Sequence, residues 1–294
     1  MRIVFLGTAA ANAYPEAFCK CDHCQEAREL GGPSLRKRSA ALINDDLLLD
    51  LGPDIMAAAQ MHAISLGNVR YCLQTHPHAD HLDLSHLLSR SPGFGVIGAP
   101  KLHFYASAAT LQRADQTFTR DLAEYGLFDA EAETKLNLKI HTVEPFQPIR
   151  AGPYRVIALP ANHYPESGSM LYAVTSVEGS IFYGVDTAAL FEEIWQSFQQ
   201  HEMRFDLVVL DHTYGPDEEG EDHLSARQVA EHAERFREEG ILKEAGRVFA
   251  THVAHAGNPV HPRLVAFASK HGYEVAYDGF EVVVGARNAR SNSP

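Results

Sequence analysis

The sequence predicts an α/β fold in which two β-sheets pack together and helices cover the outside. Three observations predict it. Apolar segments of strand length occur in two groups along the chain, and helical segments accompany each group. Hydrophobic residues make up 45% of the 294 residues, which is enough for a large core. No linker rich in proline, serine or glycine divides the chain, so we expect one domain over residues 1–285 and a frayed tail at 286–294.

The first group of predicted strands precedes residue 107. It starts with a strand that leads into a small-residue loop at 7–11, and it contains a hairpin around Asn44-Asp45. Residues 107–135 are rich in Ala, Gln and Glu and are predicted to form a helical excursion over the functional site. The predicted strands are Arg2–Leu6, Ser39–Ile43, Leu47–Asp50, Val69–Gln74 and Leu102–Tyr105, and the helices are Pro53–Met61 and Leu82–Ser89.

The second group of strands follows the excursion and alternates with longer helices. It ends in a predicted hairpin of Glu274–Ala276 and Glu281–Val284 around Asp278-Gly279. The other predicted strands are Leu136–His141, Tyr154–Leu159, Leu171–Ser176, Ile181–Val185, Leu207–Leu210 and Arg247–Ala250, and the helices are Ala189–Gln200, Ser225–Arg237 and Pro262–His271.

A dense set of potential metal ligands follows the predicted strand Val69–Gln74. Within six residues the chain has the order His-x-His-x-Asp-His. Imidazole and carboxylate groups suit zinc, manganese or iron, and four of them can begin two adjacent sites. These four candidates are His76, His78, Asp80 and His81.

Three further candidates each follow a predicted strand. They are His163, Asp186 and His252. A strand end is a rigid platform, so side chains from several strand ends can converge on one site. We expect Asp186 to bridge two metals. One metal would bind His76, His78 and His163, and the other would bind Asp80, His81 and His252.

Three of the four cysteines form a Cys-x-Cys-x-x-Cys cluster. Cys19, Cys21 and Cys24 lie within six residues, whereas Cys72 is remote. This spacing indicates metal binding rather than a disulfide framework, and it favours a reducing, cytoplasmic compartment. A tetrahedral zinc site needs a fourth ligand, for which His255 and His23 are the candidates.

The overall charge narrows the class of partner. The formal net charge is −13, which repels polyanions and argues against DNA or RNA. A small anionic substrate held by a metal is compatible with this charge. No stretch reaches the roughly 20 apolar residues of a membrane span. The sequence is also compatible with a homodimer.

In the order of its motifs the chain resembles the metallo-β-lactamase-fold superfamily. The shared elements are the Gly7-Thr8 loop, Asp50-x-Gly52, and the ligands described above in the same order. The resemblance implies a four-layer αββα sandwich of the ribonuclease Z-like type. It also implies a dinuclear site whose bridging hydroxide attacks the substrate, and an Asp50 side chain that hydrogen-bonds a ligand histidine.

The cysteine cluster and the His252-x-x-His255 pair are similar to those of PhnP-type phosphodiesterases. That resemblance implies hydrolysis of a small cyclic phosphate such as 5-phosphoribosyl 1,2-cyclic phosphate. It implies two Mn²⁺ or Zn²⁺ ions at the catalytic site. It also implies one structural Zn²⁺ bound by Cys19, Cys21, Cys24 and His255.

The same resemblance implies a histidine outside the metal ligands as general acid. His223 is our candidate, acting with Asp80 and Asp186, and His212 is its rival. Two other functions share the motif. A tRNA 3′-processing nuclease conflicts with the acidic charge, and a PqqB-like cofactor-biosynthesis or binding protein would not need all seven metal ligands.

Overall fold

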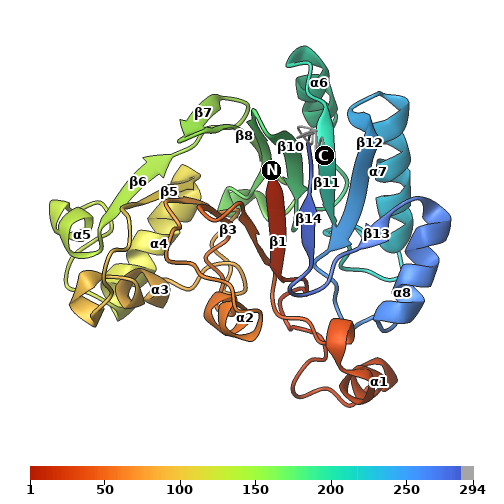
Figure 1. Cartoon of the computed structure of the whole chain (residues 1–294), viewed down its shortest axis with the longest axis horizontal. Helices are drawn as coiled ribbons and strands as arrows, with labels where there is room; N and C mark the ends of the chain where they lie inside the picture. Colours follow the sequence, from red (N-terminus) through yellow and green to blue (C-terminus); the bar gives the residue numbers. More distant parts are fainter. Residues whose placement is uncertain (217, 286–294) are drawn as a thin grey trace, which may run out of the picture.

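Two seven-stranded β-sheets face each other at the centre of the molecule, and helices cover their outer faces (Figure 1). The computed structural model describes residues 1–216 and 218–285, so the predicted frayed tail at 286–294 lies outside the described residues. The order of layers, helix, sheet, sheet, helix, confirms the predicted four-layer αββα sandwich.

The first sheet comes mainly from the N-terminal half of the chain. In spatial order its strands are β14 (Glu281–Val283), β1 (Arg2–Gly7), β2 (Ala40–Ile43), β3 (Leu47–Leu49), β4 (Tyr71–Leu73), β5 (Leu102–Ala106) and β6 (Leu138–Thr142). From β14 to β3 neighbouring strands pair antiparallel, which confirms the predicted hairpin of β2 and β3. From β3 to β6 they pair parallel.

The second sheet has the same mixed character. In spatial order its strands are β13 (Glu274–Val275), β12 (Leu242–Thr251), β11 (Phe205–Asp211), β10 (Gly179–Gly184), β9 (Met170–Ser176), β8 (Tyr154–Pro160) and β7 (Pro148–Ala151). The strands from β13 to β10 pair parallel, and those from β10 to β7 pair antiparallel. The parallel strands therefore end at one common edge.

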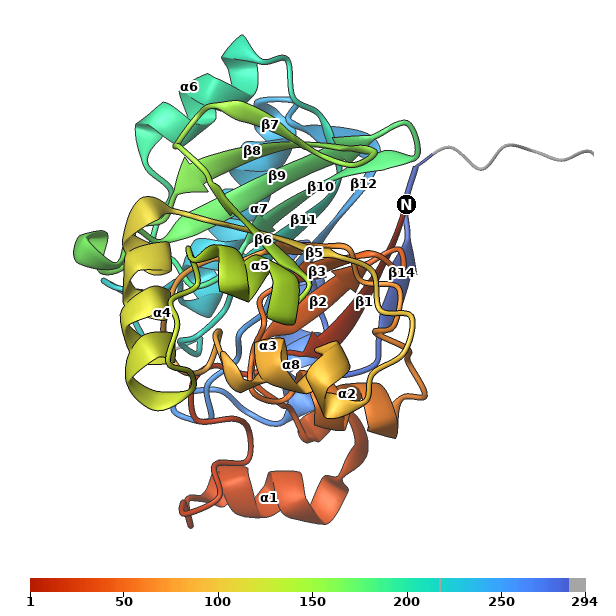
Figure 2. The same cartoon turned by 90° about the vertical axis from the view of Figure 1, so that its left-hand side faces the viewer.

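Helices form the two outer layers (Figure 2). The first sheet is covered by α2 (Ile55–Met61), α3 (Ser85–Ser89), α4 (Ala108–Asp121) and α5 (Ala130–Lys135), and the second by α6 (Glu192–Gln200), α7 (Ala226–Glu238) and α8 (His261–Ala268). The predicted helical excursion at 107–135 corresponds to α4 and α5. Leu111 and Phe118 anchor α4 in the core on the outer face of the first sheet, and Thr110 near its start donates a hydrogen bond of 3.2 Å to the Ser167 carbonyl in the loop after β8.

Three apolar layers hold the sandwich together. Successive side chains of a strand point to opposite faces. In β11, Leu207 and Val209 join the central core between the sheets, whereas Val208 and Leu210 join the core beneath α6 and α7. A strand buried on both faces has an uninterrupted apolar sequence, and this is why it could be predicted from the sequence.

The predicted C-terminal hairpin is wrong. β13 pairs parallel with β12, and β14 pairs antiparallel with β1, so the two strands belong to different sheets. The intervening Asp278 is buried, and its carboxylate accepts hydrogen bonds from the Thr8 hydroxyl and the Lys37 amide at 2.7 Å each. A tight turn still forms at Asp278-Gly279, where the Phe280 amide donates to the Tyr277 carbonyl at 3.0 Å, but the strands on its two sides pair in different sheets.

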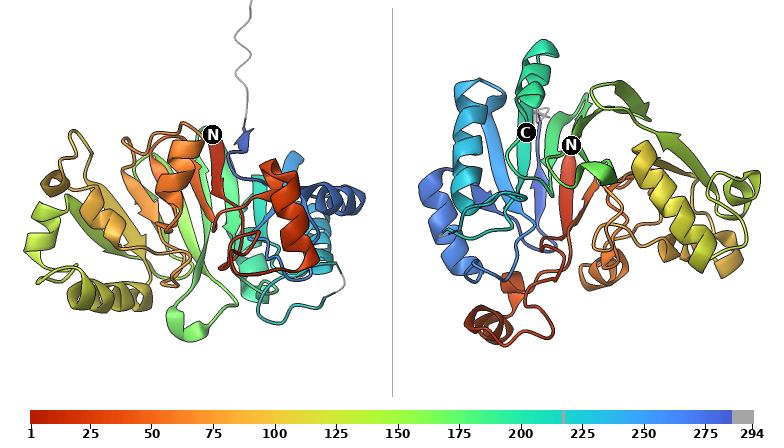
Figure 3. Two further views of the ribbon diagram at one scale, coloured as in Figure 1. Left: turned by 90° about the horizontal axis from the view of Figure 1, so that it is seen from below. Right: turned by 180° about the vertical axis from the view of Figure 1, so that it is seen from behind.

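One α-helix and one β-strand of the described residues were not predicted. Helix α1 (Asp22–Leu30) begins inside the cysteine cluster and projects from one end of the sandwich (Figure 3). Strand β7 begins with Pro148, a residue that cannot donate to a β-ladder and that strands tolerate at a sheet edge, where β7 lies. Among the described residues, no helix is both long and apolar enough to traverse a bilayer.

Candidate metal centre

The candidate ligands converge because they follow strands that end at the same side of the sandwich. The cluster His76–His81 follows β4, while His163, Asp186 and His252 follow β8, β10 and β12. Asp186 and His252 have positive φ angles of 62° and 59°. Such angles are strained for residues other than glycine and occur preferentially at functional sites.

The first ligand group consists of three imidazoles and one carboxylate. Nδ1 of His78 lies 2.9 Å from Nε2 of His76 and 3.3 Å from Nε2 of His163. Nε2 of His76 lies 3.1 Å from Oδ2 of Asp186. All four side chains are at least half-buried, so the group faces the interior of a pocket and not bulk solvent.

The second ligand group shares Asp186 with the first. Nε2 of His81 lies 3.2 Å from Asp80 Oδ2, 3.3 Å from His252 Nε2 and 3.4 Å from Asp186 Oδ2. The two groups together contain all seven residues predicted as ligands of the paired site. Asp186 is therefore placed where one carboxylate can contact ions on both sides.

The chemistry of these donors fits divalent metal ions. An ion lying about 2.0–2.2 Å from each ligand brings nitrogen and oxygen donors to the spacing observed. Burial raises the pKa of Asp80, but His81 and His252 lower it well below its usual range, so the carboxylate is ionised. Burial also lowers the pKa of His163 to about 4 and leaves a neutral imidazole, the form that binds a metal.

Asp50 orients the ligand loop after β4. Its Oδ2 lies 2.8 Å from Nδ1 of His81, as the predicted hydrogen bond to a ligand histidine requires. Its Oδ1 accepts hydrogen bonds from the amide and the hydroxyl of Thr75, and that hydroxyl lies 2.9 Å from Nδ1 of His76. Both imidazoles thus use Nδ1 for hydrogen bonding and keep Nε2 free for a metal.

Asp211 orients His252 in the same way and was not predicted. It is the last residue of β11 and is fully buried. Its Oδ2 lies 3.2 Å from Nδ1 of His252, and the Thr213 hydroxyl lies 2.8 Å from the same nitrogen. The available signal was its position directly after an apolar strand, the rule that also located Asp186 and His252.

His223 and His212 lie in different environments. Nδ1 of His223 lies 3.0 Å from Asp186 and 3.3 Å from Asp211, and its ring lines the pocket. Burial alone would lower the pKa of His223, but the hydrogen bonds to these carboxylates raise it to about 11. His212 is fully buried beside the hydroxyl of Tyr273, and burial lowers its pKa to about 4. Of the two histidines, only His223 is placed to give a proton to a molecule bound in the pocket.

The ligand groups form the floor of a pocket of about 470 Å³. Tyr164 is half exposed at the rim, and its ring packs edge-on against His163 with a centroid distance of 4.7 Å. Its φ of 34° is strained for a side chain of this size. The remaining wall residues include Ala10, Ala11, Asn12, Thr213, Ala254, His255 and Ala256.

The cysteine cluster forms a second, separate ligand group. The sulfurs of Cys19, Cys21 and Cys24 and one ring nitrogen of His255 lie within 4.8 Å of one another. His23, the competing fourth ligand, instead places Nδ1 3.4 Å from the carbonyl of His255. Three thiolates and one imidazole are a donor set that suits tetrahedral zinc.

Comparison with known proteins agrees with this architecture. The family model of the β-lactamase superfamily domain matches residues 46–253. No curated protein matches the sequence. The chain is similar in structure to a diphosphatase from the PhnP family, with a TM-score of 0.71 and 20% identity over 96% of this chain and 97% of that one.

Two other solved structures are similar over nearly their whole length. Zn²⁺-bound PqqB from Methylobacterium extorquens has a TM-score of 0.67 and 16% identity, covering 96% of this chain and 99% of that one. The short form of human tRNase Z has a TM-score of 0.64 and 15% identity, covering 97% and 100%. At these identities the structures establish the fold and leave the substrate open. The chain belongs to the β-lactamase superfamily, with the metallo-β-lactamase fold and the ligand arrangement of a metal-dependent hydrolase.

Proposed function

We propose that the protein is a dinuclear metal-dependent phosphodiesterase that hydrolyses a small cyclic phosphate. The observation that carries this proposal is the shared position of Asp186. Its carboxylate belongs to both ligand groups and also contacts His223. A paired metal site and a proton donor in the same pocket would thus act on one phosphoryl group of the substrate.

The chain's own residues divide the work of hydrolysis. Divalent cations at the seven ligands would acidify a water molecule and neutralise charge on the phosphoryl oxygens. The water oxygen forms a bond to phosphorus while the bond from phosphorus to the leaving oxygen breaks. His223, whose Nδ1 contacts the carboxylates, keeps Nε2 for donating a proton to that leaving oxygen. The product is a phosphate monoester.

The pocket wall supports a substrate with a single negative charge. Among the described residues, no lysine or arginine lines this pocket. The additional phosphate of 5-phosphoribosyl 1,2-cyclic phosphate would therefore have no lysine or arginine side chain of this wall beside it. Tyr164 offers an exposed aromatic ring at the rim, which suits a nucleobase. We therefore place nucleoside 2′,3′-cyclic phosphates ahead of the phosphoribosyl compound.

Two alternatives receive less support. A tRNA 3′-processing nuclease would need cationic contacts to a polyanion. The segment beside the pocket instead contains Glu218, Glu221 and Asp222, and Asp222 accepts a hydrogen bond from Tyr214. A PqqB-like binding protein would not need a general acid, whereas the described site contains both a complete ligand set and His223.

Hydrolysis assays with defined metals test the proposal. The purified protein is loaded with Mn²⁺ or Zn²⁺ and given bis(p-nitrophenyl) phosphate, a nucleoside 2′,3′-cyclic phosphate or 5-phosphoribosyl 1,2-cyclic phosphate. We expect turnover of the first two, and none by the Asp186→Asn variant. If the protein binds both metals and hydrolyses none of these diesters, the proposal is wrong and a binding role is favoured.

A further inference from the structure

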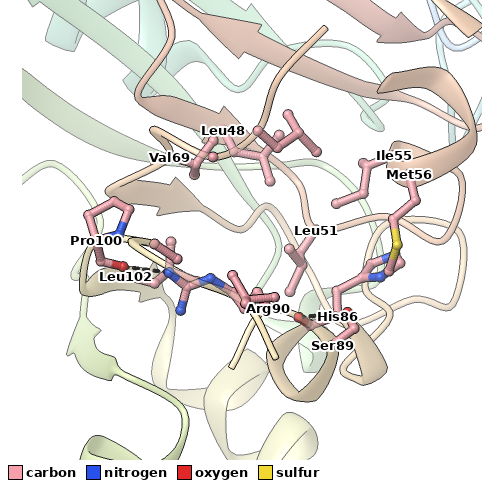
Figure 4. Close-up of a pocket in the computed structure, with 14 residues that line it drawn as sticks. Leu48, Leu51, Ile55, Met56, Val69, His86, Ser89, Arg90, Pro100 and Leu102 are labelled. Atoms are coloured by element: carbon pink, nitrogen blue, oxygen red, sulfur yellow. Dashed lines mark hydrogen bonds between the residues drawn. The ribbon is translucent and has the colours of Figure 1, made fainter. Parts of the chain in front are cut away.

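A second pocket, separate from the metal centre, lies on the outer side of the first sheet between α2, α3 and the segment 92–100 (Figure 4). Its volume is about 260 Å³, and it shares no lining residue with the metal pocket. The wall is almost entirely apolar and includes Leu48, Leu51, Ile55, Val69 and Leu102. Cavities of roughly 150 Å³ with such walls hold benzene, so this one has room for a chain of about eight carbons.

Arg90 carries the positive charge of this wall, whose other polar side chains are His86 and Ser89. Its guanidinium lies at one side of the pocket, beside Pro100 and Leu102 (Figure 4). The side chain is half-buried, and among the described residues no carboxylate forms an ion pair with it. A cation against apolar walls without a counter-ion is unfavourable unless its donors are satisfied.

Backbone carbonyls accept hydrogen bonds from some of the N–H groups of the Arg90 guanidinium. Nη1 donates to the carbonyls of Leu136 and Asn137 at 3.1 and 3.3 Å, and Nη2 donates to the carbonyl of Pro100 at 2.6 Å. Among the described residues, Nε has no hydrogen-bond partner, and Nη2 retains a second N–H group. Nε and Nη2 together form the edge of a guanidinium that pairs with a carboxylate through two parallel hydrogen bonds.

We propose that this pocket binds a small amphiphilic monocarboxylate, with its carboxylate on Arg90 and its apolar chain among Leu51, Ile55 and Val69. The ligand supplies the missing negative charge and removes apolar surface from water. Met56 and Val96, at 43% and 36% exposure, form an apolar rim through which the chain can enter. The same chain without a carboxylate would fill the pocket and leave Arg90 unpaired.

The pocket adjoins the segment that orients the metal ligands. Leu51 lies between Asp50, which contacts His81, and Gly52, whose carbonyl accepts a hydrogen bond of 3.1 Å from His86 in the pocket wall. The proposed site is nevertheless defined by binding alone and does not depend on the activity of the metal centre. A failure of one proposal therefore leaves the other intact.

Isothermal titration of the metal-loaded, full-length protein tests this proposal with two matched probes, octanoate and 1-octanol. We expect octanoate to bind about tenfold more tightly than octanol, because only the carboxylate can pair with Arg90. Arg90→Gln should remove this preference while octanol still binds. The exposed Arg113→Gln on α4 serves as the matched control and should keep the preference.

Two more variants cover the case in which Arg90→Gln disturbs the loop. Arg90→Lys retains a cation and should keep a preference for octanoate. Leu66→Trp, at a half-buried wall position, should weaken both probes by filling the space. Equal affinity of the wild-type protein for both probes would overturn the proposal. So would octanoate binding that survives Arg90→Gln, or binding that inorganic phosphate displaces from the metal pocket.

Discussion

Oδ2 of Asp211 lies 3.3 Å from Nδ1 of His223, and the same carboxylate contacts His252, a candidate metal ligand. The contact to His223 keeps the imidazole protonated. In Asp211→Asn we expect kcat to fall about 10- to 100-fold with at most a small change in KM. Both carboxylates raise the pKa of His223 to about 11, and removing one of them should lower it. As the pH rises, the variant should therefore begin to lose activity at a lower pH than the wild-type protein does.

The pH profile of kcat separates this positioning role from a structural one. A residue that only stabilises the fold would lower activity equally at every pH. If the alkaline limb of the Asp211→Asn profile coincides with that of the wild-type protein, then Asp211 does not control His223.

His223→Ala should lower turnover by about 10²–10⁴-fold, the usual contribution of a general acid. Metal content, measured by inductively coupled plasma mass spectrometry, should stay unchanged because His223 is the proposed proton donor and is not one of the seven candidate ligands. His212→Ala is the matched control and should retain turnover, since His212 contacts Tyr273 in the core. Full activity of His223→Ala would remove this residue from the mechanism.

Cys21→Ser should cost the protein the zinc expected at the cysteine cluster, and part of its stability, before it affects the chemistry. Burial raises the pKa of Cys21, but hydrogen bonds to the Cys24 backbone, His255 and Cys19 lower it to about 6, which favours the thiolate that binds zinc. We expect the zinc content to fall by one equivalent. The free energy of unfolding should fall by roughly several kcal/mol. Cys72→Ser, at the cysteine remote from the cluster, is the control and should keep all its metal. If the Cys21→Ser protein also keeps all its metal, Cys21 is not a zinc ligand.

His261 should make stability depend on pH. Burial and the neighbouring Arg36 lower the pKa of His261 to about 4, compared with about 6.5 in the unfolded chain. The unfolded state therefore binds more protons between these values, and the free energy of unfolding falls as the pH drops from 6.5 towards 4.

His261→Gln should remove that contribution, because an amide oxygen can still accept the hydrogen bond from Arg36 and does not titrate. Urea unfolding at pH 7 and pH 4.5 should show a loss on the order of 1–2 kcal/mol greater in the wild-type protein than in the variant. Equal losses would mean that His261 titrates normally in the folded state.

The sequence was sufficient for the layers and for the convergence of the candidate ligands. The motif at His76–His81 is local, and the later candidates each follow an apolar strand, so they converge because β8, β10 and β12 end at the same side of the sandwich. β10 and β11 were recognisable because their central segments, Ile181–Tyr183 and Leu207–Leu210, are buried on both faces and contain no charged residue.

What the sequence could not provide was the choice of partners over long distances. β13 and β14 have the spacing of a hairpin, but Val275 pairs with Ala250 and Val283 pairs with Arg2 in different sheets. Asp211 was overlooked because a single aspartate after a strand has many ordinary roles, and only its contacts with two histidines distinguish it. The pocket around Arg90 depends on side chains from distant elements and has no sequence motif.

An anomalous-scattering map from crystals of the protein loaded with Mn²⁺ or Zn²⁺ tests the central claim most directly. Our account predicts two strong peaks on opposite sides of Asp186. One should contact His76, His78 and His163, and the other should contact Asp80, His81 and His252. A single peak that Asp186 does not touch, or metal-replete crystals without any peak in this pocket, would contradict the account.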